Sequence, residues 1–249
     1  MDTAFIIGNG ETRLIFPINK LKGKGVIYGC NAIYRDYPTL CDYIMAVDPS
    51  MIQEMLDNED KYTSKLLTLD DITEWNYKLD DDPKAIQNLF GREWMGGDVK
   101  TGKMKSIDFT ESKGTGCSAV LHAAEAGHKE ICIFGFDILG TKQWEMGEQE
   151  MSRPHNNIYK NTANYPKRVN MKAYLKYEWL FHLRQLARKY TDVNFYFFNR
   201  REYITMNPLL VKFLGLKNYH FGIYADLKRW IDGEKNNIKW MQVTSSNIQ

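Results

Sequence analysis

The chain has 249 residues, of which 43% are hydrophobic and 26% charged, so it is long enough for one sizeable α/β core with a lid or small subdomain. No apolar run approaches the roughly 20 residues that a membrane span needs, which excludes a transmembrane segment from the expected organisation. The first expected strand begins at residue 3 and leaves no room for a signal peptide, so we expect a cytoplasmic protein.

The net charge of +2 hides an acidic first part and a basic last part. Residues 1–150 carry a net charge of −9, and residues 151–249 carry +11. The stretch from Arg153 to Lys189 is especially basic, with Glu178 as its one acid. Such a stretch suits an anionic partner, for example a nucleotide or a nucleic-acid backbone. A solvated helix face that pairs with the acidic part is the alternative interpretation.

The chain contains four cysteines, and their spacing argues against a structural zinc site. No two of them form a C-x-x-C pair. We therefore expect four buried free thiols, at Cys30, Cys41, Cys117 and Cys132. Free thiols of this kind are typical of a reducing compartment.

The apolar pattern predicts an alternation of strands and helices that is typical of an α/β protein. The expected strands cover residues 3–7, 26–30, 43–47, 65–69, 131–135 and 193–198, the last of which closes the sheet. The expected helices cover residues 50–56, 117–126, 169–190 and 207–214. The pattern thus predicts a Rossmann-like, mostly parallel sheet flanked by helices.

Polar and small residues follow four of these strands, where ligands bind in open parallel sheets. They are Gly8, Asn9 and Gly10 after the first strand, Asn31 after the second, Asp48 after the third, and Asp137 after the strand that begins near Ile131. We expect these strand ends to converge on one nucleotide-binding crevice. A tight turn at the glycines, a helix N-cap at Asp48 and a loop-fixing role for Asp137 are the purely structural alternatives.

A second candidate for anion binding is the start of the helix that follows Gly114. Thr115 and Gly116 form its first turn, where backbone N–H groups carry partial positive charge. The polar and aromatic stretch 139–168 lacks periodicity, and segments of this kind are often functional. We expect it to form a lid over the strand ends, with residues 1–138 and 169–249 forming the nucleotide-binding domain.

Several sequence blocks together resemble the bacterial lipooligosaccharide sialyltransferases. They are Ile6-Ile7-Gly8-Asn9-Gly10, Cys30-Asn31-Ala32-Ile33-Tyr34, the stretch from Thr115 to Asp137, and the run from His155 to Thr162. The run Ala46-Val47-Asp48-Pro49 is also similar to motility-accessory-factor-like and 6-hydroxymethylpterin pyrophosphokinase-like proteins. The resemblance covers blocks within residues 3–50 and 114–165, and it implies a variant of the GT-A type of fold.

The resemblance also implies roles for individual residues. Donor contacts are implied for Gly8, Asn9, Gly10, Asn31, Thr115 and Gly116. The family's lid carries two histidines four residues apart, and the second is the general base. Here His155 occupies the first position and Tyr159 the second, so either His155 is the base, an acid elsewhere takes that role, or the reaction differs, and His155 is the candidate we favour. Together with Tyr159, the basic residues Lys160, Lys167 and Arg168 are candidates to stabilise the departing phosphate.

The resulting expectation is a glycosyltransferase that moves a sugar from a nucleotide-activated donor to an acceptor hydroxyl. The acceptor is a glycan or a modified nucleobase in DNA, no metal or other cofactor is expected, and the related enzymes assemble as homo-oligomers. One alternative is a diphosphotransferase of the pterin pyrophosphokinase type, with magnesium held by Asp48 and Asp137. Another is a catalytically inactive nucleotide-binding protein.

Overall fold

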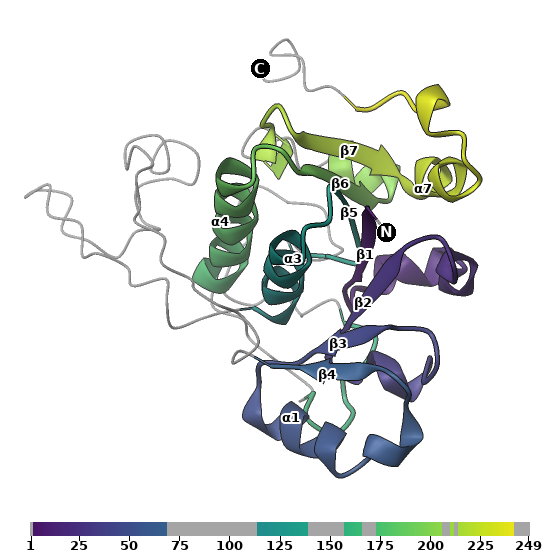
Figure 1. Ribbon diagram of the computed structural model, residues 1–249. Coiled ribbons are helices and arrows are strands. Elements are labelled where there is room, and N and C mark those ends of the chain that lie inside the picture. Colours follow the sequence, from purple (N-terminus) through teal and green to yellow (C-terminus); the bar gives the residue numbers. More distant parts are fainter. Residues whose placement is uncertain are drawn as a thin grey trace, which may run out of the picture.

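A computed structural model describes residues 2–68, 114–138, 157–165, 173–205, 210–211 and 214–241, with backbone only for residues 173–178. Its centre is a seven-stranded sheet in which every neighbouring pair is parallel (Figure 1). The strands are β1 (Thr3–Ile7), β2 (Val26–Cys30), β3 (Tyr43–Met45), β4 (Lys65–Leu67), β5 (Glu130–Phe134), β6 (Asn194–Asn199) and β7 (Tyr219–Ile223). The predicted α/β, Rossmann-like sheet is thereby confirmed.

The strand order β4-β3-β2-β1-β5-β6-β7 places the first strand at the centre. Successive strands extend the sheet outward from β1 on one side, and the chain then returns to the other side of β1 to add β5. In sheets of this kind ligands bind beyond the carboxyl ends of the strands, where the order reverses. The order reverses between β1 and β5, so the topology directs attention to the carboxyl ends of these two strands and to the neighbouring end of β2.

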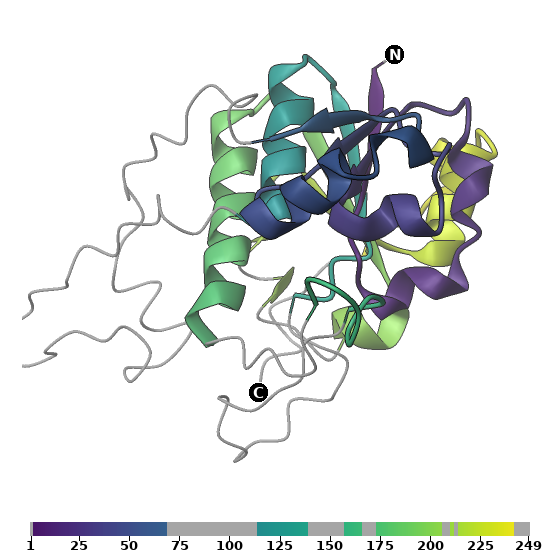
Figure 2. The same ribbon diagram turned by 90° about the horizontal axis from the view of Figure 1, so that it is seen from below.

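Helices cover both faces of the sheet (Figures 1 and 2). The α-helices are α1 (Pro49–Leu56), α3 (Thr115–Glu125), α4 (Ala173–Lys189), α5 (Arg201–Thr205) and α7 (Tyr224–Ile231). The 3-10 helices are η1 (Glu11–Ile15), η2 (Ile18–Leu21), η3 (Asn31–Arg35), η4 (Glu59–Lys61) and η8 (Lys235–Asn237). Among these helices, none has the length and apolar character needed to cross a lipid bilayer.

The two faces of the sheet bury alternate residues of each strand, as the period of two in a β-strand requires. Ala4 and Ile6 of β1 join the apolar layer that contains α3 and α4. Phe5 and Ile7 join the layer that contains η2 and α7. Because both layers are apolar, the polar groups of the central strands concentrate at the strand ends.

Helix α3 packs closely on the sheet because its inner face carries small residues. Ala119 and Ala123 are fully buried against the strands. A Cβ atom added to Gly116 would lie 2.6 Å from the Phe136 ring. The small residues therefore bring the first turn of α3 down to the carboxyl edge of the sheet.

The carboxyl-terminal part differs from the sequence-based expectation. The strand at residues 193–198 was expected to close the sheet, and this is wrong because β7 pairs with β6 beyond it. The outer side of β7 is in turn bonded to the tail, since the N–H of Met241 donates to the carbonyl of Phe221 at 2.9 Å. Trp240 of the same tail packs against the Tyr196 ring, with the ring centroids 5.0 Å apart.

Candidate functional site

Three of the predicted donor-binding side chains come together at the carboxyl edge of β1 and β2. Thr115, in the first turn of α3, donates a hydrogen bond from its hydroxyl to Oδ1 of Asn31 at 3.3 Å. Asn9, after β1, donates from Nδ2 to the carbonyl of Cys30 at 2.8 Å. Side chains from three separate parts of the sequence thus form one polar cluster, and their contact with a donor stays a prediction.

The backbone at Asn31 explains how β2 ends at this cluster. Asn31 has a φ of +49°, a left-handed conformation that asparagine tolerates better than most residues. This conformation turns the chain from the extended β2 into η3. The same turn places the Asn31 amide beside Thr115.

The amino end of α3 is the second part of the cluster. Gly114 precedes the helix in an extended conformation, and no side chain of the described residues caps the first turn. The first N–H groups of a helix carry partial positive charge and favour an anion nearby. The positions of Thr115 and Gly116 are therefore compatible with the anion contact expected from the sequence.

The N–H groups of Gly8 and Gly10, in the segment after β1, are hydrogen-bonded to the end of β5. The N–H of Gly8 donates to the carbonyl of Phe134 at 2.9 Å, and the N–H of Gly10 donates to the carbonyl of Gly135 at 2.7 Å. A Cβ atom added to Gly8 would lie 2.7 Å from the Phe136 ring. Both N–H groups are thus bonded to the end of β5 and are not directed at a phosphate, and since Gly10 has an extended backbone this segment continues along β5 and is not the tight turn of the structural alternative.

Arg13 is the charged residue of this site that the sequence analysis missed. It is 2% exposed, and one of its terminal nitrogens donates to the carbonyl of Gly8 and to Oδ1 of Asn9, both at 3.1 Å. The other terminal nitrogen donates to the hydroxyl of Tyr159 at 3.0 Å. Among the described residues, no carboxylate lies within ion-pairing distance of Arg13. Within this described part of the chain, the charge of Arg13 is balanced by hydrogen-bond acceptors alone, and a buried cation of this kind favours a negative charge nearby.

Tyr159 occupies an anchoring position. Its buried hydroxyl accepts the hydrogen bond from Arg13 and donates to a carboxylate oxygen of Asp36 at 2.7 Å. Burial raises the pKa of Tyr159 well above the ordinary value of 10.0, although Arg13 acts in the opposite direction. A phenol with this pKa is a poor base near neutral pH, so the position fits an anchor for residues 157–165 better than the expected catalytic role.

Residues 157–165 cover the edge at which the polar cluster lies. The N–H of Ile158 donates to the carbonyl of Asn9 at 2.9 Å, which joins this segment to the end of β1. The Tyr165 hydroxyl is buried close to the side chains of Asn31 and Asn9. These two side chains act to lower the pKa of Tyr165, but burial raises it by more, to about 12. Part of the stretch 139–168 thus lies against Asn9 and Asn31, and its action as a lid stays a prediction.

Asp137 is bound on several sides by the protein. One carboxylate oxygen accepts from the N–H of Thr12 at 3.0 Å, and the other accepts from the Thr12 hydroxyl and from Nδ2 of Asn199 at 3.3 Å. The Thr12 hydroxyl is also 3.1 Å from the Tyr224 hydroxyl. Asp137 therefore joins the chain after β1 to the ends of β5, β6 and β7, as in the loop-fixing alternative.

Asp48 lies at the N-cap position of α1, but its side chain makes no capping hydrogen bond. The expected N-cap position is therefore correct, but the capping group is the backbone carbonyl of Asp48, which accepts from the N–H of Met51 at 3.0 Å. Asp48 as a whole residue is exposed, but neighbouring protein atoms desolvate its carboxylate and raise the pKa of that group above 3.8. Its expected role toward a donor or magnesium stays a prediction.

Of the expected lid cations, Lys160 is described and pairs with Glu11 on η1. Half of the Lys160 side chain is exposed, so this pair holds residues 157–165 against η1 only weakly. His155, Lys167 and Arg168 lie outside the described residues. Within the described ranges, no three potential metal-ligating side chains are grouped together.

No family model, curated protein or solved structure matches this chain.

Proposed function

We propose that this chain is a glycosyltransferase whose nucleotide-activated donor binds where β1, β2 and the amino end of α3 meet. The observation that carries the proposal is the cluster of Asn9, Asn31 and Thr115, which lies at the carboxyl ends of β1 and β2, next to the reversal point between β1 and β5 of an all-parallel sheet. Sheets of this order bind ligands at this point. The resemblance noted in the sequence supports the choice of a nucleotide-activated sugar as the ligand.

The charges around the cluster favour a phosphate-bearing ligand. Arg13 contributes a buried positive charge beside Asn9, and α3 contributes the positive end of its dipole. The amide groups of Asn9 and Asn31 can both donate and accept hydrogen bonds, which suits a base or ribose edge. Together these groups match the mixed chemistry of a nucleotide, which combines a charged phosphate with neutral polar edges.

In the proposed reaction, an acceptor hydroxyl transfers its proton to a base and attacks the anomeric carbon of the donor sugar. A new glycosidic C–O bond forms, and the bond from the anomeric carbon to the phosphate oxygen breaks. The nucleotide leaves with the bonding electron pair, and nearby positive groups stabilise its charge. His155 is the proposed base because an imidazole titrates near neutral pH. Residues 157–165 act as part of a lid that limits hydrolysis of the donor.

A thermal-shift screen against nucleotides and nucleotide sugars tests donor binding. A ligand at one hundred times its dissociation constant stabilises the folded state by about 2.7 kcal/mol. Thr115→Val removes one hydroxyl and Asn31→Gly removes the amide while keeping the left-handed backbone, so each should weaken binding roughly fivefold to tenfold. Lys24→Ala, an exposed change before β2, is the control and should bind as the wild type does.

Product analysis then tests the reaction. His155→Ala should lower turnover about a hundredfold and leave the nucleotide-induced shift intact. Turnover that a chelator abolishes would instead indicate the magnesium-dependent diphosphotransferase, and binding without turnover of any donor would indicate an inactive nucleotide-binding protein. If no nucleotide stabilises the chain, or if both cluster variants bind like the wild type, the proposed site is wrong.

A further inference from the structure

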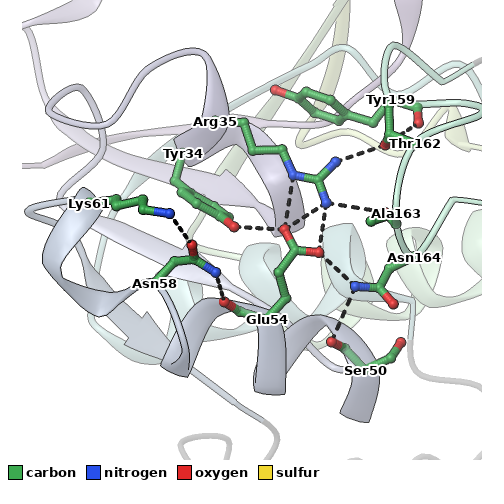
Figure 3. Close-up of polar contacts among 10 residues, drawn as sticks. All are labelled: Tyr34, Arg35, Ser50, Glu54, Asn58, Lys61, Tyr159, Thr162, Ala163 and Asn164. Atoms are coloured by element: carbon green, nitrogen blue, oxygen red, sulfur yellow. Dashed lines mark hydrogen bonds and ion pairs between the residues drawn. The ribbon is translucent and has the colours of Figure 1, made fainter.

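A concave site is formed in part by the segment 157–165, which also covers the proposed donor edge, and Figure 3 shows polar contacts of several residues that line this site. It is an open groove of about 640 Å³ between η3, α1 and residues 163–164. This volume is within the range of small-molecule binding sites. The groove is separate from the cluster of Asn9, Asn31 and Thr115, none of which lines it.

One wall of the groove is held by a single carboxylate. Glu54 of α1 accepts hydrogen bonds from the Tyr34 hydroxyl and from Nδ2 of Asn164, both at 2.6 Å (Figure 3). It also forms a two-pronged ion pair with Arg35, whose nitrogens lie 2.9 Å and 2.6 Å from the two carboxylate oxygens. The charge of Arg35 is therefore neutralised by Glu54, and these contacts tie η3 and Asn164 to α1.

The polar side chains of the remaining walls form some hydrogen bonds within the protein and keep further donors and acceptors for a ligand. Gln53 donates from Nε2 to one carboxylate oxygen of Asp57 at 2.8 Å, which leaves the Gln53 carbonyl oxygen and the other Asp57 oxygen as acceptors. Lys61 donates to Oδ1 of Asn58 at 2.6 Å and has two further N–H donors. All four residues line the groove, so both hydrogen-bond donors and acceptors belong to its lining.

The charges of the lining cancel. Arg35 and Lys61 are the cations, and Glu54 and Asp57 are the anions. A groove that binds a nucleic-acid backbone needs an excess of cations that track the phosphates. A balanced lining of amides, carboxylates and an ammonium group instead matches a neutral ligand with many hydroxyl groups, each of which both donates and accepts.

The groove is connected to the proposed donor site by one short segment. Ala163 and Asn164 line the groove, while Ile158 and Tyr159 of the same segment contact Asn9 and Arg13. Arg35 holds the segment in between, donating to the Thr162 hydroxyl at 2.7 Å and to the Ala163 carbonyl at 3.1 Å. A ligand in the groove therefore contacts the segment that covers the donor edge.

We infer that this groove binds the acceptor and that the acceptor is a neutral carbohydrate. The inference rests on the proposed glycosyltransferase function, and it chooses between the glycan and the nucleic acid that the sequence left open. It predicts that acceptor binding and donor binding depend on different residues.

The test is binding of the purified full-length chain to an array of neutral and acidic oligosaccharides, together with a 20-base-pair DNA duplex. We expect retention of neutral oligosaccharides and no retention of the duplex at 150 mM salt. Gln53→Ala and Lys61→Ala should each weaken carbohydrate binding about tenfold and leave the nucleotide-induced thermal shift unchanged. Glu59→Ala and Lys65→Ala, exposed changes outside the groove, are the matched controls and should bind normally.

Three outcomes would overturn the inference. They are the absence of any neutral carbohydrate among the bound ligands, carbohydrate binding that the Gln53 and Lys61 variants do not weaken, and salt-sensitive binding of the duplex that Lys61→Ala abolishes. Each differs from failure of the proposed function itself, which would appear as the absence of a nucleotide-induced shift.

Discussion

Glu54 of α1 joins three parts of the chain, because its carboxylate accepts hydrogen bonds from Tyr34 and Arg35 of η3 and from Asn164. Burial by itself would raise the pKa of Glu54, but the hydrogen bonds from Arg35, Tyr34 and Asn164 outweigh it and hold the pKa below 4.5. The ionised form is therefore bound more tightly in the folded state than in the unfolded chain. Since the carboxylate supports one wall of the groove, its titration should affect both stability and the shape of that wall.

The pH dependence of stability tests this role. The folded pKa is depressed, so the stabilisation is fully present above the unfolded value near 4.5 and is lost as the pH falls through the folded value. Urea unfolding between pH 7 and pH 3 should show a smaller loss of stability for Glu54→Gln than for the wild type. Glu59→Gln is the control and should follow the wild type. Parallel curves for wild type and Glu54→Gln would contradict the assignment.

Single residues also show what the sequence could and could not predict about the site. Asn9, Asn31 and Thr115 were predictable because each directly follows a strand or begins a helix, and a parallel sheet brings such positions to one edge. Arg13 was not, because it lies in a short 3-10 turn without a hydrophobic period, and only the tertiary structure places Tyr159 against it. Tyr159 was singled out from the resemblance, and its burial depends on contacts with Arg13 and Asp36 that no local pattern encodes.

At the scale of elements, the packing of α3 decides where the proposed donor site lies. The sequence predicted this helix correctly because its alanines and the glycines at both ends are local signals. It missed β7, where the run Tyr219-His220-Phe221-Gly222-Ile223 lacks a clean alternation and includes a glycine. The β7 glycine has a packing reason that only the structure reveals, because an added Cβ would lie 2.9 Å from the Phe198 ring.

The contact between Gly116 and Phe136 tests whether close packing fixes α3. Gly116→Ala would place a Cβ atom 2.6 Å from the Phe136 ring and should destabilise the fold by about 1–3 kcal/mol, despite the better helix propensity of alanine. Phe136→Leu shortens the opposing side chain, so the double variant should recover about 1 kcal/mol relative to the sum of the single changes. Urea unfolding of the four proteins gives this coupling energy. Additive effects would show that the helix does not depend on this contact.

At the scale of the whole molecule, the four cysteines are divided between the two apolar layers that cover the sheet. All four are free and buried, as the sequence predicted. Cys30 and Cys117 lie in the layer with α3 and α4, whereas Cys41 and Cys132 lie in the opposite layer. Burial raises the pKa of Cys30 and of Cys41 to about 12, and it raises the pKa of Cys117 and Cys132 well above 9.0. Because thiolates are the reactive form, these groups should react only when the layers open.

Labelling of the native protein with a thiol-specific disulfide reagent at pH 8 therefore measures opening of the two layers. We expect no rapid reaction in native buffer and modification of all four thiols in urea. When opening and closing are fast relative to labelling, a nucleotide at one hundred times its dissociation constant should slow the reaction about a hundredfold, because it binds only the closed state. Alkylation and mass spectrometry identify which cysteine reacts first. Fast native labelling of Cys30, which directly precedes Asn31, would show that the end of β2 opens independently of the sheet and would count against a preformed donor site there.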